Sequence, residues 1–209
     1  MTGDSKFFIG VVLAAILVVG GIILYSGNKP QPTIDNIDLS LAQKLGDDLK
    51  PIKIVEFGDF QCPACQTAAV PLRAIYEKNK ETVQLSFFHF PLPQHKNAFP
   101  AALASEAAGK QGQFWEMYDL IYENQIQWES LSEPNNAFKV FAQELNLNAE
   151  QFLADLDDSA AKSRIQSNAD YGSALGVNQT PTFFINGQRY TGSQTESDWQ
   201  IAIDAAKPK

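Results

Sequence analysis

Cysteine and histidine are scarce in this chain, whose 209 residues contain two of each. Two cysteines close at most one disulfide, which excludes a small scaffold held together by several bridges. Basic residues are also outnumbered, with 16 Lys and Arg against 24 Asp and Glu. The formal net charge of −8 argues against nucleic acid as a partner and is typical of a solvated surface. Internal repeats and long low-complexity tracts are absent from the sequence as well.

A long apolar segment lies near the N-terminus, where 19 residues from Phe7 to Tyr25 carry no charge. As a helix this segment would span about 28 Å, close to the ~30 Å hydrocarbon core of a bilayer. The residues after it lack the A-x-A pattern of a signal-peptide cleavage site, and no nearby cysteine offers a site for lipid attachment. We therefore expect an uncleaved transmembrane anchor, with a cleaved signal peptide or a buried core helix as alternatives.

The anchor divides the chain into three parts. Residues 1–25 are predicted to be a cytoplasmic tip and the anchor, residues 26–50 a tether and lead-in, and residues 51–206 one folded domain. The flanking charges barely decide the orientation, but a single N-terminal anchor ahead of a domain of this size usually exports that domain. We expect a single-pass protein of the cell membrane with its domain on the extracytoplasmic side. The roughly 180 residues after the anchor suffice for a core without a structural disulfide.

Both cysteines belong to one C-x-x-C motif, Cys62-Pro63-Ala64-Cys65, between a predicted strand (Ile52–Phe57) and a predicted helix. A cysteine at a helix N-terminus faces unpaired backbone N–H groups and the positive end of the helix dipole, and both stabilise a thiolate. Cys62 is therefore the expected nucleophile. Cys65 follows one helical turn later on the same face, close enough for a disulfide with Cys62. Such a pair suits an oxidising compartment.

The remaining elements form a strand-helix-strand unit, a helical stretch and a final hairpin with a helix. The first helix is expected to reach Asn79, and a second strand, Val83–Phe90, completes a unit typical of parallel sheets. Residues 97–176 read as helical, with helices expected at Ala98–Gly109, Phe114–Asn124, Asn135–Leu145, Ala149–Leu156 and Ser159–Leu175. Strands at Thr182–Ile185 and Gln188–Tyr190 follow, with Asn186-Gly187 suited to a type I′ turn between them. A helix over Thr195–Ala206 ends the domain.

Two further readings concern the lead-in and several residues of the helical stretch. Asp35–Lys50 fits either a helix or an irregular segment. Core packing rather than ligand contact is the interpretation of five residues in the helical stretch, namely Trp115, Tyr118, Leu120, Ile121 and Tyr122.

This order of elements resembles the thioredoxin fold as elaborated in DsbA-like thiol-disulfide oxidoreductases of the membrane-anchored type. Three segments carry the resemblance: Glu56-Phe57-Gly58-Asp59-Phe60-Gln61-Cys62-Pro63-Ala64-Cys65; Phe90-Pro91-Leu92 with His95 and Ala98, followed by Gln111-Gly112-Gln113-Phe114-Trp115; and Gly176-Val177-Asn178-Gln179-Thr180-Pro181-Thr182-Phe183-Phe184-Ile185-Asn186-Gly187. The implied fold class is α/β, with a central mixed sheet flanked by helices and a helical insertion at about 97–176 between an N-terminal βαβ unit and a C-terminal ββα unit.

The resemblance also implies roles for single residues. Cys62 would be the exposed nucleophile and Cys65 the resolving cysteine, with Pro181 beside them as a cis-proline; an ordinary trans bond is the default for any X-Pro pair. A cis bond would turn the Thr180 backbone toward an extended substrate segment. Glu56 would be a buried acid that trades a proton with Cys65, unless it points to solvent from the other side of its strand.

Pro63 and Ala64 also enter the predicted substrate-binding site, because the dipeptide between the cysteines tunes the reduction potential and so the direction of exchange. Strong oxidants of the family often carry His where this chain has Ala64, which puts the oxidising strength in doubt. We predict a dithiol oxidase that introduces disulfides, with a membrane-tethered reductase as the main alternative. A disulfide isomerase is less favoured, because only about 25 residues separate the anchor from the first strand.

The predicted oxidase is expected to act as a monomer on exported cysteine-containing proteins and to be reoxidised by a membrane quinone-linked partner. It needs no metal or cofactor beyond the Cys62–Cys65 disulfide. Two alternatives without redox activity stay open at this point. One is a structural zinc module in which Cys62 and Cys65 join His89 and His95. The other is a binding or chaperone domain with an incidental disulfide.

Overall fold

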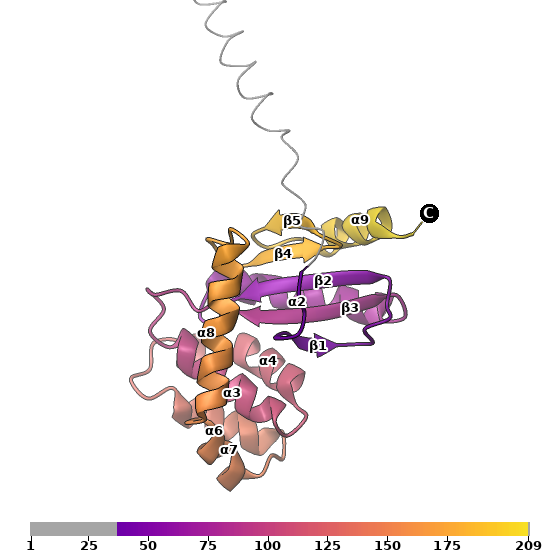
Figure 1. The fold of residues 1–209 in the computed structure, drawn as a ribbon. Helices are drawn as coiled ribbons and strands as arrows, with labels where there is room; N and C mark the ends of the chain where they lie inside the picture. Colours follow the sequence, from indigo (N-terminus) through magenta and orange to yellow (C-terminus); the bar gives the residue numbers. More distant parts are fainter. Residues whose placement is uncertain (1–36, 209) are drawn as a thin grey trace, which may run out of the picture. The chain divides into compact units, whose positions relative to one another are not determined.

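A five-stranded mixed sheet forms the centre of residues 37–208, the part of the chain that this computed structural model describes (Figure 1). The strand order is β1-β3-β2-β4-β5, in which β2 and β3 are parallel and all other neighbours are antiparallel. The strands are β1 (Gln43–Leu45), β2 (Ile52–Gly58), β3 (Val83–His89), β4 (Thr182–Ile185) and β5 (Gln188–Thr191). The helices are α2 (Pro63–Asn79), α3 (Ala98–Gly109), α4 (Phe114–Glu123), α5 (Gln125–Trp128), α6 (Asn135–Glu144), α7 (Ala149–Asp155), α8 (Ser159–Ala174) and α9 (Glu196–Ala206).

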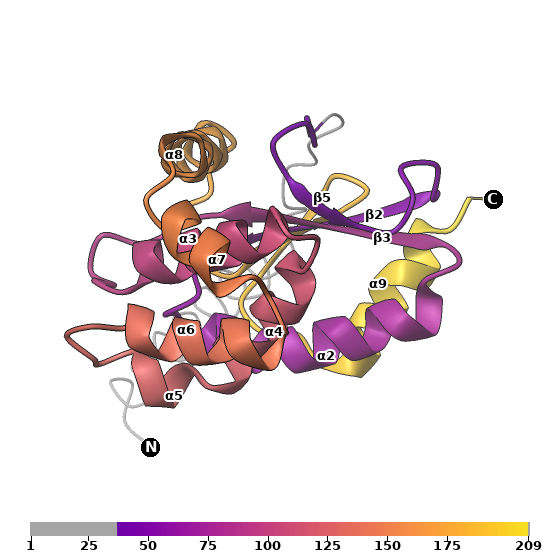
Figure 2. The same ribbon diagram turned by 90° about the horizontal axis from the view of Figure 1, so that it is seen from below.

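Helices cover both faces of the sheet, so its central strands are buried except at Lys53, near the start of β2. Figure 2 shows α2 and α9 on one side of the sheet and α8 on the other. Side chains alternate accordingly along β2: Ile52 and Ile54 join the large core on the α2 side, whereas Val55 and Phe57 join a smaller aromatic core on the α8 side. A strand buried on both faces reads as a continuous apolar run, and a charged residue within it must also be buried.

The helical insertion between β3 and β4 is built around α3. This helix is rich in alanine, and its small side chains let α4, α6, α7 and α8 all pack against it. Nine of its twelve residues are buried as a result. The predicted fold class is therefore confirmed: a thioredoxin-type mixed sheet with a helical insertion between the βαβ and ββα units.

Most predicted elements are confirmed to within one or two residues at their ends. The predicted turn at Asn186-Gly187 is also present, with positive φ angles of 43° and 85°. Two elements differ. The lead-in 35–50 contains strand β1, which pairs antiparallel with β3, and the short helix α5 follows α4 directly. Elements of three or four residues, such as β1 and α5, are too short to show a periodic pattern of apolar residues. The strand that pairs with β1 also lies about 40 residues away in the sequence.

The predicted transmembrane anchor lies outside the described residues, as do residues 26–36 of the predicted tether and lead-in. Within residues 37–208, none of the helices combines the length and the apolar character needed to cross a membrane.

Candidate active site

Cys62 occupies the N-cap of α2, at the carboxyl end of β2. Its backbone is extended (φ −76°, ψ 121°), and Pro63 follows at the first helical position, where its missing N–H costs no hydrogen bond. The Cys62 N–H donates to the Asp59 carbonyl at 3.0 Å, which closes the turn between strand and helix. Cys62 is 7% exposed and Cys65 is fully buried, so the nucleophile lies nearer the surface.

The two thiols differ in acidity because their surroundings differ. A hydrogen bond from Cys65 is the largest cause that lowers the pKa of Cys62 to about 5; the Thr180 side chain and the backbone N–H groups of Cys65 and Ala64 add to it and together outweigh burial. Burial, followed by the hydrogen bond with Cys62 and its charge, raises the pKa of Cys65 well above its usual value. At neutral pH Cys62 is thus a thiolate and Cys65 a thiol.

We expect the reduced protein to show a thiolate absorbance at 240 nm that titrates with a midpoint near pH 5. Because the folded pKa of Cys62 is depressed, the thiolate stabilises the reduced fold above the unfolded pKa, and this contribution is lost as the pH falls through about 5. Cys62→Ser should remove the low-pH step. A midpoint near 9 in the unaltered protein would contradict the assigned environment of Cys62.

Thr180 and Pro181 lie opposite the cysteines, at the start of β4, which pairs with β2. The Thr180–Pro181 peptide bond is cis, as predicted, so the trans alternative is wrong. Cys62 Sγ lies 3.4 Å from the Thr180 carbonyl oxygen, which accepts a hydrogen bond from Cys62 when its thiol is protonated. Thr180 is 9% exposed, and its buried hydroxyl lies close enough to Cys62 to help lower the pKa of that thiol.

Glu56 lies in the middle of β2 and is completely buried, so the alternative that it points to solvent is wrong. The Tyr118 hydroxyl donates a hydrogen bond to Glu56 Oε2 at 2.9 Å, while Oε1 has no partner in the described part of the chain. Burial is the main cause that raises the pKa of Glu56 to about 8; the Cys62 thiolate adds to the rise and the Tyr118 hydroxyl opposes it. A carboxyl group of this acidity exchanges protons near neutral pH.

Two residues that sequence reasoning missed hold the active-site turn. Gln125 of α5 is buried, and its side-chain amide donates to the carbonyl oxygens of Phe60 at 2.7 Å and Cys62 at 3.1 Å. Asp59 is equally buried, and its backbone N–H lies 3.5 Å from Cys65 Sγ. The Asp59 carboxylate accepts hydrogen bonds from several groups, namely the Gln61 N–H at 2.7 Å, the Leu92 N–H at 2.8 Å and His95 Nδ1 at 2.7 Å.

Only the Asp59 contact left a signal in the sequence. In an Asx turn the Asp side chain accepts a hydrogen bond from the backbone N–H two residues later, and Asp59 accepts such a bond from Gln61. Gln125 lies more than 60 residues from the cysteines in an element with no readable period, and nothing near it in the chain indicates its partners.

The histidines of the zinc alternative have other partners. His89 Nε2 lies 2.9 Å from Glu106 Oε1, and His95 Nδ1 lies 2.7 Å from Asp59 Oδ2. His89 is buried in β3, as expected for a core residue, although its Nδ1 has no hydrogen-bond partner within the described residues. Within residues 37–208, no cluster of three or more His, Cys, Asp or Glu side chains has the arrangement of a metal site.

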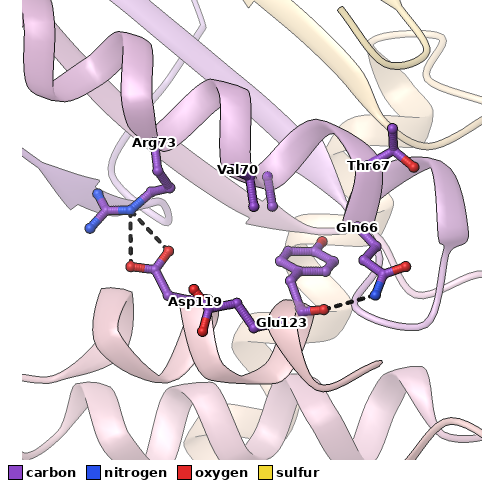
Figure 3. A pocket seen from close by; sticks show the side chains of 8 residues that line it. Gln66, Thr67, Val70, Arg73, Asp119 and Glu123 are labelled. Atoms are coloured by element: carbon purple, nitrogen blue, oxygen red, sulfur yellow. Dashed lines mark hydrogen bonds and ion pairs between the residues drawn. The ribbon is translucent and has the colours of Figure 1, made fainter. Parts of the chain in front are cut away.

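A pocket of about 500 Å³ lies beside the cysteine motif, between α2 and α4 (Figure 3). Its labelled side chains are Gln66, Thr67, Val70 and Arg73 of α2 and Asp119 and Glu123 of α4. Arg73 Nε donates to both carboxylate oxygens of Asp119, at 3.0 and 3.2 Å. The Gln66 amide donates to the Tyr122 carbonyl at 3.1 Å. These contacts fix α4, which carries Tyr118, against the helix that carries the cysteines.

A C-x-x-C motif at a helix N-cap, a cis-proline opposite it and a mixed five-stranded sheet define a thioredoxin-fold protein. Residues 43–205 match the family described as Thioredoxin. A probable disulfide bond formation protein D of Bacillus cereus is 34% identical over 197 residues, which cover 90% of this chain and 91% of that protein. Its counterpart in Bacillus anthracis is 35% identical over 198 residues, again 90% of this chain and 91% of that protein.

A solved structure shows the same architecture. The crystal structure of oxidised BdbD from Bacillus subtilis is similar with a TM-score of 0.73 and 23% identity, over 86% of this chain and 98% of that one. The chain belongs to the thioredoxin family, and within it to the DsbA-like proteins. It is accordingly a thiol-disulfide oxidoreductase.

Proposed function

We propose that this oxidoreductase is a dithiol oxidase that introduces disulfide bonds into exported proteins. The difference in acidity between the two active-site thiols carries the proposal. A pKa of about 5 makes Cys62 a stable thiolate and therefore a good leaving group, which favours the reduced enzyme and raises its reduction potential. The low pKa arises without a histidine at position 64, since Cys65, Thr180 and backbone N–H groups supply the hydrogen bonds.

The proposed reaction begins with the Cys62–Cys65 disulfide. A substrate thiolate attacks Cys62 Sγ, the bond between the two cysteines breaks, and Cys65 leaves and takes a proton from Glu56. A second substrate thiolate then attacks the substrate sulfur of the mixed disulfide, and Cys62 leaves as a thiolate. The substrate loses two electrons, and the enzyme keeps them as its dithiol, so the reaction needs no cofactor beyond the cysteine pair.

Other residues of the site would bind the substrate. The Thr180 backbone beside Pro181 is proposed to pair with an extended substrate segment, as an added strand next to Cys62. Pro63 and Ala64 form the surface of the turn between the cysteines: Pro63 is exposed, and Ala64 is partly exposed. A small side chain at position 64 leaves access to Cys62 open.

The proposed setting is the extracytoplasmic side of the cell membrane. The apolar run Phe7–Tyr25 would anchor the chain, residues 26–50 would form the tether and lead-in, and residues 51–206 would act as a monomeric domain on exported proteins. A membrane quinone-linked protein is the proposed oxidant of the Cys62–Cys65 dithiol. The similarity to the disulfide bond formation proteins of Bacillus cereus and Bacillus anthracis supports a role in forming disulfides.

The reduction potential of Cys62–Cys65 tests the direction of exchange. Equilibration with glutathione buffers at pH 7, followed by acid trapping and alkylation, should give a value between roughly −200 and −100 mV. This range favours oxidation of substrate dithiols. A value near or below about −270 mV, the range of thioredoxin, would instead identify a membrane-tethered reductase.

A further inference from the structure

The Glu56 carboxyl group makes only one hydrogen bond to the described residues, and the donor is a tyrosine. Tyr118 Oη lies 2.9 Å from Glu56 Oε2, and both side chains are completely buried. Tyr118 is on α4, in the helical insertion, whereas Glu56 is on β2, 62 residues earlier. The core-packing interpretation of Tyr118 is therefore incomplete, because its ring packs in the core while its hydroxyl contacts the acid of the active site.

No cation lies among the groups that act on Glu56. From α2, Cys62 raises its pKa by its charge, and Cys65 interacts with it electrostatically. From α4, Tyr122, next to Tyr118, also interacts with it electrostatically. On β3, the residue paired with Glu56 is Phe87, and on β4 it is Phe183. The Tyr118 hydroxyl is thus the one group among the described residues that stabilises the charged form of Glu56.

We propose that Tyr118 is a positioning residue, whose hydroxyl orients the Glu56 carboxyl group and sets the pH range in which Glu56 exchanges a proton with Cys65. The proposal rests on the proposed role of Glu56 in disulfide exchange. When the Cys62–Cys65 bond breaks, the proton moves from Glu56 to Cys65 Sγ, and the carboxylate that remains keeps its hydrogen bond from Tyr118. Without that bond Glu56 is a weaker acid, and it holds its proton to higher pH.

The chain offers a matched control for this contact. Tyr122 is one turn further along α4, is 1% exposed and stacks edge-on against Tyr118 with ring centroids 4.8 Å apart. Its hydroxyl is buried but has no hydrogen-bond partner within residues 37–208. Tyr118→Phe and Tyr122→Phe therefore remove the same atom from the same cluster of aromatic rings, and only the first removes the hydrogen bond to Glu56.

The direct test is a ¹³C NMR titration of the Glu56 carboxyl group in the reduced protein, with its signal assigned by Glu56→Gln. The unaltered protein should give a midpoint near 8. Hydrogen bonds to charged groups are strong enough that Tyr118→Phe should raise this midpoint by about one to two units. Tyr122→Phe should leave it within about 0.3 units. An unchanged midpoint in Tyr118→Phe, or an equal shift in Tyr122→Phe, would overturn the proposal.

A kinetic measurement links this shift to exchange. The pH profile for oxidation of a dithiol peptide should lose activity at higher pH in Tyr118→Phe than in the unaltered enzyme, and should not change with Tyr118→Phe when Glu56→Gln is already present. A change of equal size in the Glu56→Gln background would overturn the proposal. Failure of the oxidase proposal is a separate outcome, because it would appear in the reduction potential and leave the NMR midpoints as expected.

Discussion

Replacing Cys62 with serine is expected to slow disulfide exchange by at least about 10³-fold, because the reaction proceeds through a covalent bond to this sulfur. The serine hydroxyl is not ionised near neutral pH, and it cannot form a disulfide. Cys62 is the only cysteine near the surface among the described residues, since Cys65 is fully buried. The measurement is the rate at which the protein, first treated with an oxidant, oxidises a reduced two-cysteine peptide. The same rate is measured for Cys62→Ser after the same treatment.

Cys65→Ser is the matched comparison, because it also replaces a cysteine sulfur with oxygen, three residues further along the chain. This variant keeps the Cys62 nucleophile but lacks the resolving thiol. When it is mixed with two single-cysteine peptides joined by a disulfide, Cys62 should attack one sulfur, the other peptide should leave as a thiol, and the mixed disulfide should accumulate and appear in the mass spectrum. Cys62→Ser should form no such adduct. Retention of more than about a tenth of the exchange rate in Cys62→Ser would contradict the assignment of the nucleophile.

Glu106→Gln is expected to cost about 3–5 kcal/mol of unfolding free energy, because it breaks a buried ion cluster and leaves its partners behind. Glu106 is 4% exposed in α3. Its carboxylate meets three groups from separate elements, namely His89 Nε2 at 2.9 Å, Gln43 Nε2 at 2.9 Å and Arg164 Nε at 3.5 Å. The cluster thus connects β1, β3 and α8 to the central helix of the insertion. Urea denaturation of both proteins at pH 7 measures the loss.

The pH dependence adds a second readout. Burial alone would raise the pKa of Glu106, but the hydrogen bond and charge of His89, with Gln43 and Arg164, outweigh burial and lower it. A depressed pKa stabilises the fold above the unfolded value, so the difference between the two proteins should shrink as the pH falls below about 4. Glu144→Gln, on an exposed residue at the end of α6, should change stability by less than about 0.5 kcal/mol. An equal loss in both variants would contradict the role of the cluster.

The sequence was sufficient to predict the chemistry of the site where local signals were strong. Cys62 and Cys65 lie at the predicted strand-to-helix boundary, and the predicted cis bond before Pro181 is present beside them. Most helices have the predicted bounds because their apolar periodicity extends over two or more turns. Burial of Glu56 was one of two predicted alternatives, and the decisive fact is that helices cover both faces of the sheet, which a single strand does not reveal.

The contacts that support the site were beyond prediction because they join distant parts of the chain. The donor to Glu56 lies 62 residues after it, and the amide that holds the Cys62 carbonyl lies 63 residues after that cysteine. Tyr118 and Gln125 fit a helical core pattern equally well with or without these hydrogen bonds. These hydrogen bonds depend on how the helical insertion packs against the sheet. The spacing of apolar residues along the sequence contains no information about that packing.

The complete burial of Cys65, three residues after a Cys62 that is 7% exposed, has a practical consequence. In a Cys62→Ser protein, Cys65 is the only thiol in the chain. A labelling reagent reaches it only when α2 separates from the sheet, so the labelling rate counts opening events of the active-site helix rather than chemical reactivity. The labelling rate of Cys65 therefore measures local unfolding at the active site separately from unfolding of the whole domain. The measurement needs no introduced probe.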